Sequence, residues 1–327
     1  MKIALITGIN GQDGSYLAEY LLDRGYEVYG VVRRSSVENA EKMRNILSFS
    51  ERIHIVPCSL ENALSVYKLF VKVQPDECYH LAASSFVSYA LEDDLSIMMN
   101  NFTTTHNILS SIVETCPSCR MYFAGSSEIF GNVKEAPQSE KTAYNPRSVY
   151  GISKMAGHSL IKNYRERYNV YACTGFTYNH ESPRRGYTFV TRKITSFVAG
   201  VVFGAANKLE LGNLDAVRDW GYAPEYVEAM HKMLQRDTPK DYVIATGSLH
   251  SVRELLEIAF GKVGLDYREY IHVNEAFLRP EGEIPLVGNP SAIYQDLGWK
   301  ARKGIEEIIS DMVETDIQIL KKRNGKR

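Results

Sequence analysis

The stretch MKIALITGINGQDGSYLAEYLL (residues 1–22) decides the fold. Its apolar run ends at Thr7, glycines follow at positions 8, 11 and 14, and a helical pattern continues from them. Such glycines allow a tight turn, a close approach of backbone to a pyrophosphate, and tight helix–strand packing. A plain structural turn is the alternative. The residues predicted to surround a dinucleotide here are Gly8, Asn10, Gly11, Gln12, Asp13 and Gly14.

Short apolar runs and amphipathic stretches alternate over the first half of the chain, which is typical of βαβ units. The strands are predicted at 2–7, 27–32, 52–57, 77–81, 120–125 and 170–174. Helices are predicted between them at 14–24, 63–73, 95–115 and 149–168. The pattern indicates an α/β fold with a doubly wound parallel sheet, the Rossmann arrangement.

After residue 178 the pattern loosens into loops and helices, the latter predicted at 188–205, 223–234, 251–261 and 303–321. We expect residues 1–178 to form the dinucleotide-binding domain. Residues 179–327 would mainly form a smaller C-terminal α/β domain that binds substrate. A strand near 241–246 could return to the main sheet.

Composition excludes several classes of protein. The 327 residues carry 38 basic and 39 acidic side chains, which argues against a nucleic-acid-binding surface. No apolar run approaches the roughly 18 residues of a membrane span. The five cysteines are widely spaced and odd in number, and no Cys or His set has zinc-site spacing. We therefore expect a cytoplasmic protein with no membrane, metal or nucleic-acid partner.

The second predicted strand ends in basic and hydroxyl residues. Arg33, Arg34, Ser35 and Ser36 stand where an acid would bind a ribose 2′-hydroxyl. Arginine beside hydroxyls suits a 2′-phosphate instead. The sequence therefore favours NADP over NAD, the alternative being a solvated basic loop.

Four residues form a candidate reactive set. Tyr150 and Lys154 are four apart, so a helix would place both on one side. A tyrosine base needs its pKa lowered from about 10, which a nearby ammonium and the positive nicotinamide ring can do in a water-poor site. Ser126 and Glu128 follow a predicted strand at the edge where α/β sheets bind ligands. Because hydride transfer needs no carboxylate, Glu128 suggests an additional proton abstraction or elimination, unless it only lies at a helix start.

These residues resemble the GDP-mannose 4,6-dehydratase family of extended short-chain dehydrogenases/reductases. The resemblance runs along most of the chain and is densest at 8–20, 33–36, 126–131, 146–154, 179–186, 190–193 and 211–221. It implies that Tyr150 removes the proton of the sugar 4-hydroxyl, that Lys154 supports it, and that Ser126 replaces the family threonine. Glu128 would remove the carbon 5 proton and assist loss of the 6-hydroxyl.

The resemblance also implies two binding sets. Besides the turn, Tyr150 and Lys154, the NADP set comprises Arg33, Arg34, Ser35, Leu60, Leu81, Ala82, Ser85, His180 and Arg185. The GDP-sugar set comprises Ser85, Ser127, Asn179, Lys193, Gly212, Arg218 and Arg279. Arginines 218 and 279 suit pyrophosphate because a guanidinium binds phosphate oxygens in pairs.

Two departures from the family pattern bear on binding. Ser59 stands where the family has an aspartate at the adenine, and the segment after Arg279 differs in its acid spacing. The implied substrate is GDP-mannose or a close relative such as GDP-manno-heptose. The alternatives are a GDP-sugar 4-reductase or epimerase of the same fold, or an idle NADP-binding scaffold. The resemblance further implies a homodimer or homotetramer.

Overall fold

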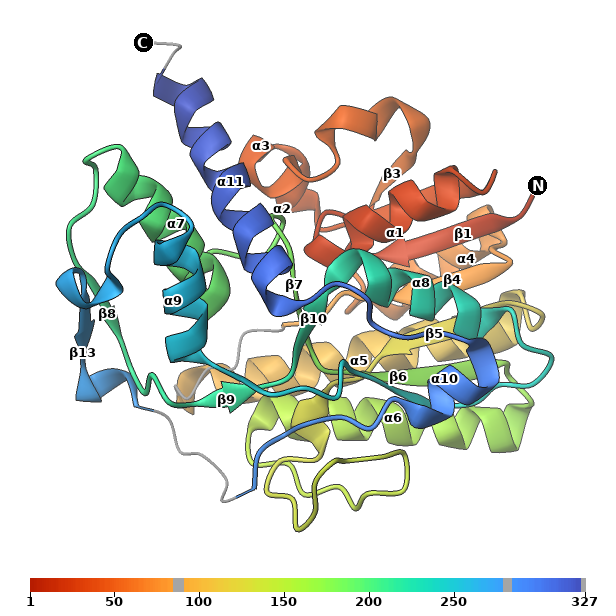
Figure 1. Cartoon of the computed structure of the whole chain (residues 1–327). Coiled ribbons are helices and arrows are strands. Elements are labelled where there is room, and N and C mark those ends of the chain that lie inside the picture. Colours follow the sequence, from red (N-terminus) through yellow and green to blue (C-terminus); the bar gives the residue numbers. More distant parts are fainter. Residues whose placement is uncertain (85–90, 279–283, 325–327) are drawn as a thin grey trace.

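A parallel sheet lies at the centre of the structure, a computed structural model that describes residues 1–84, 91–278 and 284–324 (Figure 1). Its strand order is β11-β6-β5-β4-β1-β2-β3. The chain runs outward from β1 to β3, then crosses to β4 and runs outward the other way, so the predicted doubly wound sheet is confirmed. The strands are β1 Ile3–Thr7, β2 Glu27–Val32, β3 His54–Pro57, β4 Glu77–His80, β5 Arg120–Ala124, β6 Ala172–Thr177 and β11 Tyr242–Ile244.

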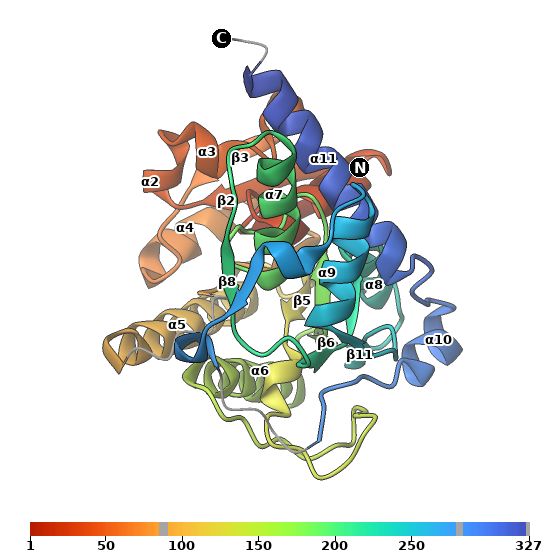
Figure 2. The ribbon, with the colours of Figure 1, turned by 60° about the vertical axis from the view of Figure 1, so that its left-hand side comes forward.

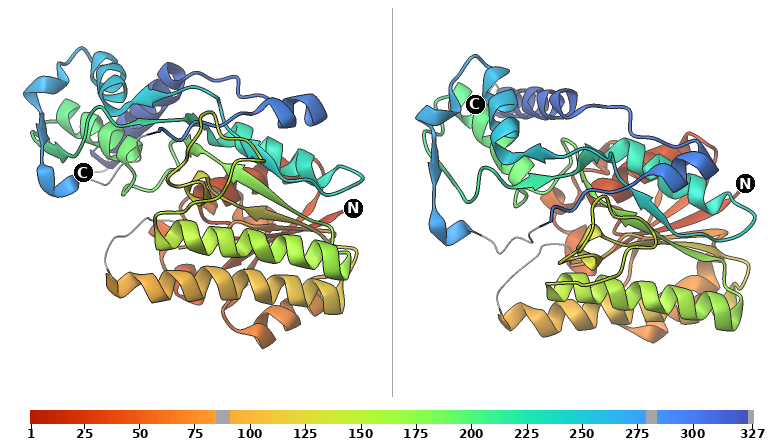
Figure 3. Two further views of the ribbon diagram at one scale, coloured as in Figure 1. Left: turned by 90° about the horizontal axis from the view of Figure 1, so that it is seen from below. Right: turned by 60° about the horizontal axis from the view of Figure 1, so that its bottom comes forward.

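Helices cover both faces of this sheet (Figure 3). On β1, Ala4 and Ile6 pack toward one face and Leu5 toward the other, because side chains alternate along a strand. The first face carries α1 Gln12–Leu22, α8 Ala223–Leu234 and α10 Ser291–Leu297. The second carries α4 Ala63–Val73, α5 Leu91–Thr115 and α6 Val149–Tyr168.

A third apolar cluster forms where three further helices pack together (Figure 2). They are α7 Val190–Val202, α9 Val252–Gly261 and α11 Ile305–Asn324. Three two-stranded sheets accompany them: β7 Asn179–Glu181 with β10 Trp220–Tyr222, β9 Val217–Arg218 with β12 His250–Ser251, and β8 Leu209–Leu211 with β13 Ile271–Val273. The remaining short helices are α2 Arg34–Val37, α3 Ala40–Met43, η1 Leu47–Arg52, η2 Ser127–Ile129, η3 Tyr267–Glu269 and η4 Glu275–Phe277.

The predicted elements mostly agree with the observed ones. Helices α4, α6 and α8 have the expected bounds, and β11 pairs with β6, as expected of a returning strand. Helix α1 begins at Gln12, earlier than expected, because Gly11 is its N-cap and the turn leads straight into the helix. The strands β7 to β10 were not predicted, since two or three residues carry no readable periodicity. In the described ranges, no helix combines the length and apolarity that crossing a bilayer requires.

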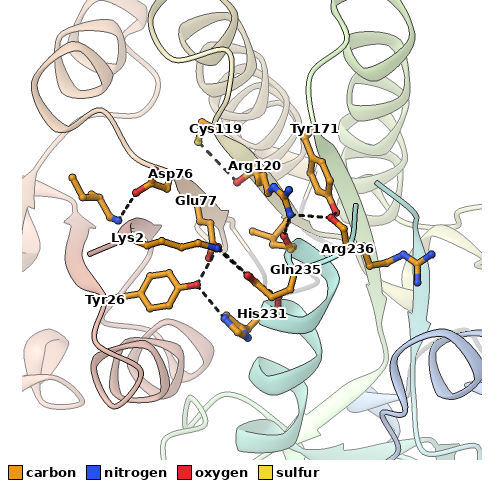
Figure 4. Close-up of polar contacts among 12 residues, drawn as sticks. Lys2, Tyr26, Asp76, Glu77, Cys119, Arg120, Tyr171, His231, Gln235 and Arg236 are labelled. Atoms are coloured by element: carbon orange, nitrogen blue, oxygen red, sulfur yellow. Dashed lines mark hydrogen bonds and ion pairs between the residues drawn. The ribbon is translucent and has the colours of Figure 1, made fainter. Parts of the chain in front are cut away.

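A buried carboxylate joins the amino-terminal edge of the sheet to α8 (Figure 4). Glu77 Oε1 accepts hydrogen bonds from Lys2 Nζ at 2.9 Å, Tyr26 Oη at 3.1 Å and Gln235 Nε2 at 3.0 Å. Its Oε2 accepts from Tyr79 Oη at 2.7 Å. Burial raises the pKa of Glu77, but these hydrogen bonds outweigh burial and hold it below its ordinary value. The carboxylate therefore stabilises the edge of the sheet opposite the strand ends that bind ligands.

We predict that Glu77→Gln lowers the free energy of unfolding by about 1–3 kcal/mol, since it replaces an ionised acceptor by an amide. Because the pKa of Glu77 is lowered in the fold, its contribution is present above the unfolded pKa and is lost as the pH falls. Urea unfolding at several pH values should show a weaker acid dependence in the variant. Glu51→Gln, at an exposed acid outside this cluster, is the control and should change the free energy of unfolding by less than about 0.5 kcal/mol. Equal stability of wild type and Glu77→Gln at neutral pH would contradict the prediction.

Candidate active site

A cavity of about 1390 Å³ lies between the carboxyl ends of the sheet strands and the elements around α7. Single small-ligand sites usually measure roughly 300–1,000 Å³, so this cleft has room for a dinucleotide and a second ligand. Residues that follow β1, β2, β3, β4, β5 and β6 all line it. Strand ends of this kind are where open α/β sheets bind ligands.

The glycine turn after β1 forms one end of the cleft. Gly8 has a φ of +73°, and a Cβ at Gly14 would lie 2.4 Å from the Gly8 carbonyl oxygen. A Cβ at Gly11 would also lie close to the Gly8 carbonyl oxygen, at 3.2 Å. No side chain caps the first turn of α1, so its N–H groups remain available. This glycine cradle at a helix N-terminus fits a pyrophosphate.

Side chains of the turn are tied to β7. His180 Nε2 lies 2.9 Å from Asp13 Oδ2, and His180 Nδ1 lies 2.7 Å from the Tyr178 carbonyl oxygen. Gln12 Nε2 donates to the His180 carbonyl oxygen at 2.9 Å. Burial lowers the pKa of His180, but Asp13 outweighs it and the pKa is raised. Both ring nitrogens face acceptors, which fits an imidazolium that holds the turn against β7.

The basic residues after β2 divide into two groups. Arg33 and Ser36 line the cleft, whereas Arg34 and Ser35 are exposed and outside its lining. Helix α2 begins at Arg34, which turns these two side chains away. Sequence reasoning missed further polar residues that line this end of the cleft, namely Asn39, Lys42, Arg44 and Asn45. In the sequence these four residues form only a polar run without a clear helical pattern, and such a run does not indicate a binding role.

Ser126, Glu128, Tyr150 and Lys154 all line the same cleft. Tyr150 and Lys154 lie in the first turns of α6, where Ser148 caps the helix. Ser126 Oγ accepts from the Glu128 backbone N–H at 3.3 Å, and Ser126 lies near enough to the Tyr150 phenol to lower its pKa. Lys154 Nζ donates to the Ala124 carbonyl oxygen at 2.7 Å and lies 5.8 Å from the centre of the Tyr150 ring. The structure therefore brings together the whole reactive set.

Burial is the largest influence on the ionisation of Tyr150 and Lys154. Burial raises the pKa of Tyr150 to about 12, although its hydrogen bond with Ser126 and the charge of Arg185 act the other way. Burial also lowers the pKa of Lys154 to about 8, against the attraction of Asp13. The Lys154 ammonium donates its hydrogen bond to Ala124 and not to the phenol, while it stays 5.8 Å from the centre of the Tyr150 ring. Ionising Tyr150 thus requires further positive charge in the cleft.

The other binding residues are distributed as follows. Leu60, Leu81, Ala82, His180 and Arg185 line the cleft, as do Asn179, Lys193, Gly212 and Arg218 on the opposite wall. Ser127 is buried and outside the lining. Ser85 and Arg279 lie outside the described residues. At Gly212 a Cβ would lie 2.4 Å from the Phe277 carbonyl oxygen, so glycine permits this close approach of two chain segments.

The family model described as "GDP-mannose 4,6 dehydratase" matches residues 5–312. The chain belongs to the GDP-mannose 4,6-dehydratase family. It is 42% identical over 330 residues to GDP-mannose 4,6 dehydratase 1 of Arabidopsis thaliana, covering 98% of this chain and 91% of that protein. With GDP-mannose 4,6-dehydratase of Vibrio cholerae the identity is 37% over 352 residues, covering 97% and 94%. The resemblance drawn from the motifs is therefore confirmed.

Solved structures agree with the fold. UDP-glucose 4-epimerase of Thermotoga maritima superposes with a TM-score of 0.85 at 21% identity, covering 97% of this chain and 99% of that one. At this identity the likeness concerns the fold. It shows that this chain has the Rossmann architecture.

The cysteines lie away from this chemistry. All five are buried free thiols, including Cys116 and Cys119, and none lines the reactive end of the cleft. Within the part of the chain that the structure describes, no three Cys, His, Asp or Glu side chains gather as metal ligands would. The Cys116–Cys119 spacing thus corresponds to a turn between α5 and β5.

We predict that Lys154→Met stabilises the folded protein by about 1–3 kcal/mol, because a buried ammonium is costly. With the folded pKa lowered to about 8, this cost is full below pH 8 and fades as the pH rises toward 10.5. Thermal unfolding between pH 6 and 10 should show the largest gain at low pH. Lys162→Met, an exposed position of α6, is the control and should change little. A lower melting temperature for Lys154→Met at pH 7 would refute the prediction.

Proposed function

We propose that the protein is a nucleotide-sugar 4,6-dehydratase. It converts a GDP-hexose, GDP-mannose or a close relative such as GDP-manno-heptose, to the 4-keto-6-deoxy sugar with loss of water. The observation that carries this proposal is the presence of Glu128 in one cleft with Ser126, Tyr150 and Lys154. A reductase or epimerase would use the last three alone, whereas elimination needs an additional acid–base group.

NADP is the proposed cofactor. It would accept a hydride from carbon 4 of the sugar and return that hydride to carbon 6. The glycine turn fits its pyrophosphate, and Arg33, Lys42 and Arg44 supply positive charge for the 2′-phosphate at the ends of β2 and α3. No acid follows β2 directly to favour a free 2′-hydroxyl.

Tyr150 is the proposed base for the 4-hydroxyl. Its pKa of about 12 keeps the phenol protonated at rest, so a positive charge beside it would be needed to make it a base. Ser126 lines the cleft beside the phenol and can hydrogen-bond the sugar oxygen. Lys154, with a pKa of about 8, remains mostly protonated near neutral pH and supplies part of the charge.

Glu128 carries the elimination. Oxidation at carbon 4 acidifies the carbon 5 proton, because the resulting carbanion is an enolate. Glu128 then takes this proton, and the carboxylic acid donates it to the leaving 6-hydroxyl, which departs as water. Hydride addition at carbon 6 and protonation at carbon 5, by the proton that Tyr150 took from the 4-hydroxyl, complete a reaction with no net oxidation.

The opposite wall is proposed to hold the GDP-sugar. Asn179, Lys193, Gly212 and Arg218 come from elements after residue 178, which supports a division into a cofactor-binding part (1–178) and a mainly sugar-nucleotide-binding part (179–327). Guanidinium and ammonium groups suit a diphosphate. The buried free thiols suit the reducing cytoplasm, the compartment we propose.

An exposed apolar strip on α5 supports a homo-oligomer. On α5, the side chain of Leu95 is 73% exposed and that of Met99 is 56% exposed, and Phe102 is exposed as well. Ile152 on the adjacent helix α6 is also exposed. Figure 3 shows α5 and α6 side by side on the outside of the molecule. Contiguous exposed apolar side chains of this kind mark protein interfaces. We propose that two copies pair through this face in a homodimer, which could assemble further into a tetramer.

The function is tested by incubating the protein with GDP-mannose or GDP-manno-heptose and catalytic NADP, without added reductant. A 4-keto-6-deoxy product formed under these conditions supports the dehydratase. A carbon 4 epimer, or a product that appears only with stoichiometric NADPH, would favour the epimerase or reductase.

We predict that Glu128→Gln slows elimination by roughly a hundredfold or more, because the amide can neither take nor give the proton. Folding and NADP binding should persist, since the amide is nearly isosteric. The measurement is exchange at carbon 5 in deuterated water together with formation of the 6-deoxy product. Exchange and product formation at the wild-type rate would make Glu128 a bystander.

We predict that the double substitution Leu95→Lys and Met99→Lys converts the oligomer to monomers at micromolar concentration, because ammonium groups would be desolvated at the interface. Light scattering gives the mass. Leu64→Lys with Val71→Lys, another exposed apolar pair, on α4, is the control and should leave the mass unchanged. A monomeric wild type would contradict the proposed pairing.

A further inference from the structure

A carboxylate that was not among the expected binding residues lies in the cleft beyond the carboxyl end of β3. Glu61 lines the cavity next to Leu60 and follows the edge strand of the sheet. Its side chain is 43% exposed, so part of the carboxylate faces the cavity. None of the chemistry proposed above uses it.

Three polar side chains hold this carboxylate in place. Ser59 Oγ donates to Glu61 Oε2 at 2.9 Å. The Asn100 amide, oriented by its neighbours, donates to Glu61 Oε1 at 3.2 Å and accepts from Arg33 Nη2 at 2.9 Å. Arg33 Nη2 itself lies 3.9 Å from Glu61 Oε1. Glu61 is therefore positioned from β2, the loop after β3, and α5.

The location corresponds to one part of a dinucleotide. With the pyrophosphate at the β1–α1 turn and the ribose at the end of β2, the base extends toward the end of β3. Val32, Cys58 and Leu60 line the cleft there and offer apolar surface for a flat ring. The base of NADP thus lies within reach of Glu61 if the cofactor binds along this path.

The charge of a carboxylate determines which ligand groups it can contact. An ionised carboxylate only accepts hydrogen bonds, so it repels a 2′-phosphate and pairs with an N–H donor. The exocyclic amino group of adenine is such a donor. We propose that Glu61 accepts a hydrogen bond from this amino group and selects adenine over bases that carry a carbonyl there. Ser59, which occupies the position of the family aspartate, instead supports Glu61 by its hydroxyl.

This inference rests on the proposed function, because it takes NADP as the cofactor. It is tested with NADP and its hypoxanthine analogue, in which a carbonyl oxygen replaces the amino group. Titration calorimetry on the full-length protein freed of nucleotide gives both affinities. We expect wild type to bind NADP at least roughly tenfold more tightly than the analogue, the usual scale for a charged hydrogen bond.

Two variants and a control separate base selection from other roles. Glu61→Ala should bind both dinucleotides within about threefold of each other. Glu61→Gln should bind the analogue more tightly than wild type does, because an amide can donate to the carbonyl. Glu51→Ala, an exposed acid outside the cleft lining, should keep the wild-type ratio.

Three results would overturn the inference. Equal binding of NADP and the analogue to wild type removes base selection while leaving the cofactor proposal intact. A Glu61→Ala protein that keeps the wild-type ratio, but changes its preference for NADP over NAD, would show that Glu61 only positions Arg33. Failure of wild type to bind either compound would contradict the cofactor proposal as well.

Discussion

The close approach of α1 to the end of β1 is the constraint on which the rest of the site depends. A Cβ at Gly14 would collide with the Gly8 carbonyl oxygen at 2.4 Å, so only glycine lets the helix start here. Because α1 begins here, the uncapped N–H groups of its first turn face the cleft. Gln12 and Asp13 also hydrogen-bond His180 on β7. Strand β7 pairs with β10, which adjoins the strand that ends in Arg218. One backbone contact thus orders both walls of the cleft.

The reactive groups are placed where burial opposes their charges. Burial raises the pKa of Tyr150 and lowers that of Lys154, and only the hydrogen bonds and charges around them limit these shifts. By contrast, the buried carboxylate of Glu77 at the other edge of the sheet is fully paired and its pKa is lowered. Glu77 stabilises the resting fold, whereas the groups of the cleft gain their favourable partners only when ligands supply charge.

The sequence predicts features that depend on local patterns. The glycine turn, the bounds of α6, and the placement of Ser126 and Glu128 after β5 follow from periodicity and short motifs, and the structure contains them all. Features set by distant contacts were not predictable. The hydrogen bond of Gln12 to the His180 backbone is one such feature. Others are the direction of the Lys154 ammonium toward Ala124 and the support of Glu61 by Asn100 of α5.

The central claim is that one cleft oxidises carbon 4, eliminates water and returns the same hydride to carbon 6. The most direct test is turnover of GDP-mannose carrying deuterium at carbon 4, with catalytic NADP in ordinary water, followed by NMR of the product. The account predicts that the deuterium is retained and lies on carbon 6 of the 4-keto-6-deoxy sugar. Product with no deuterium at carbon 6, or a carbon 4 epimer that retains its 6-hydroxyl, would contradict it.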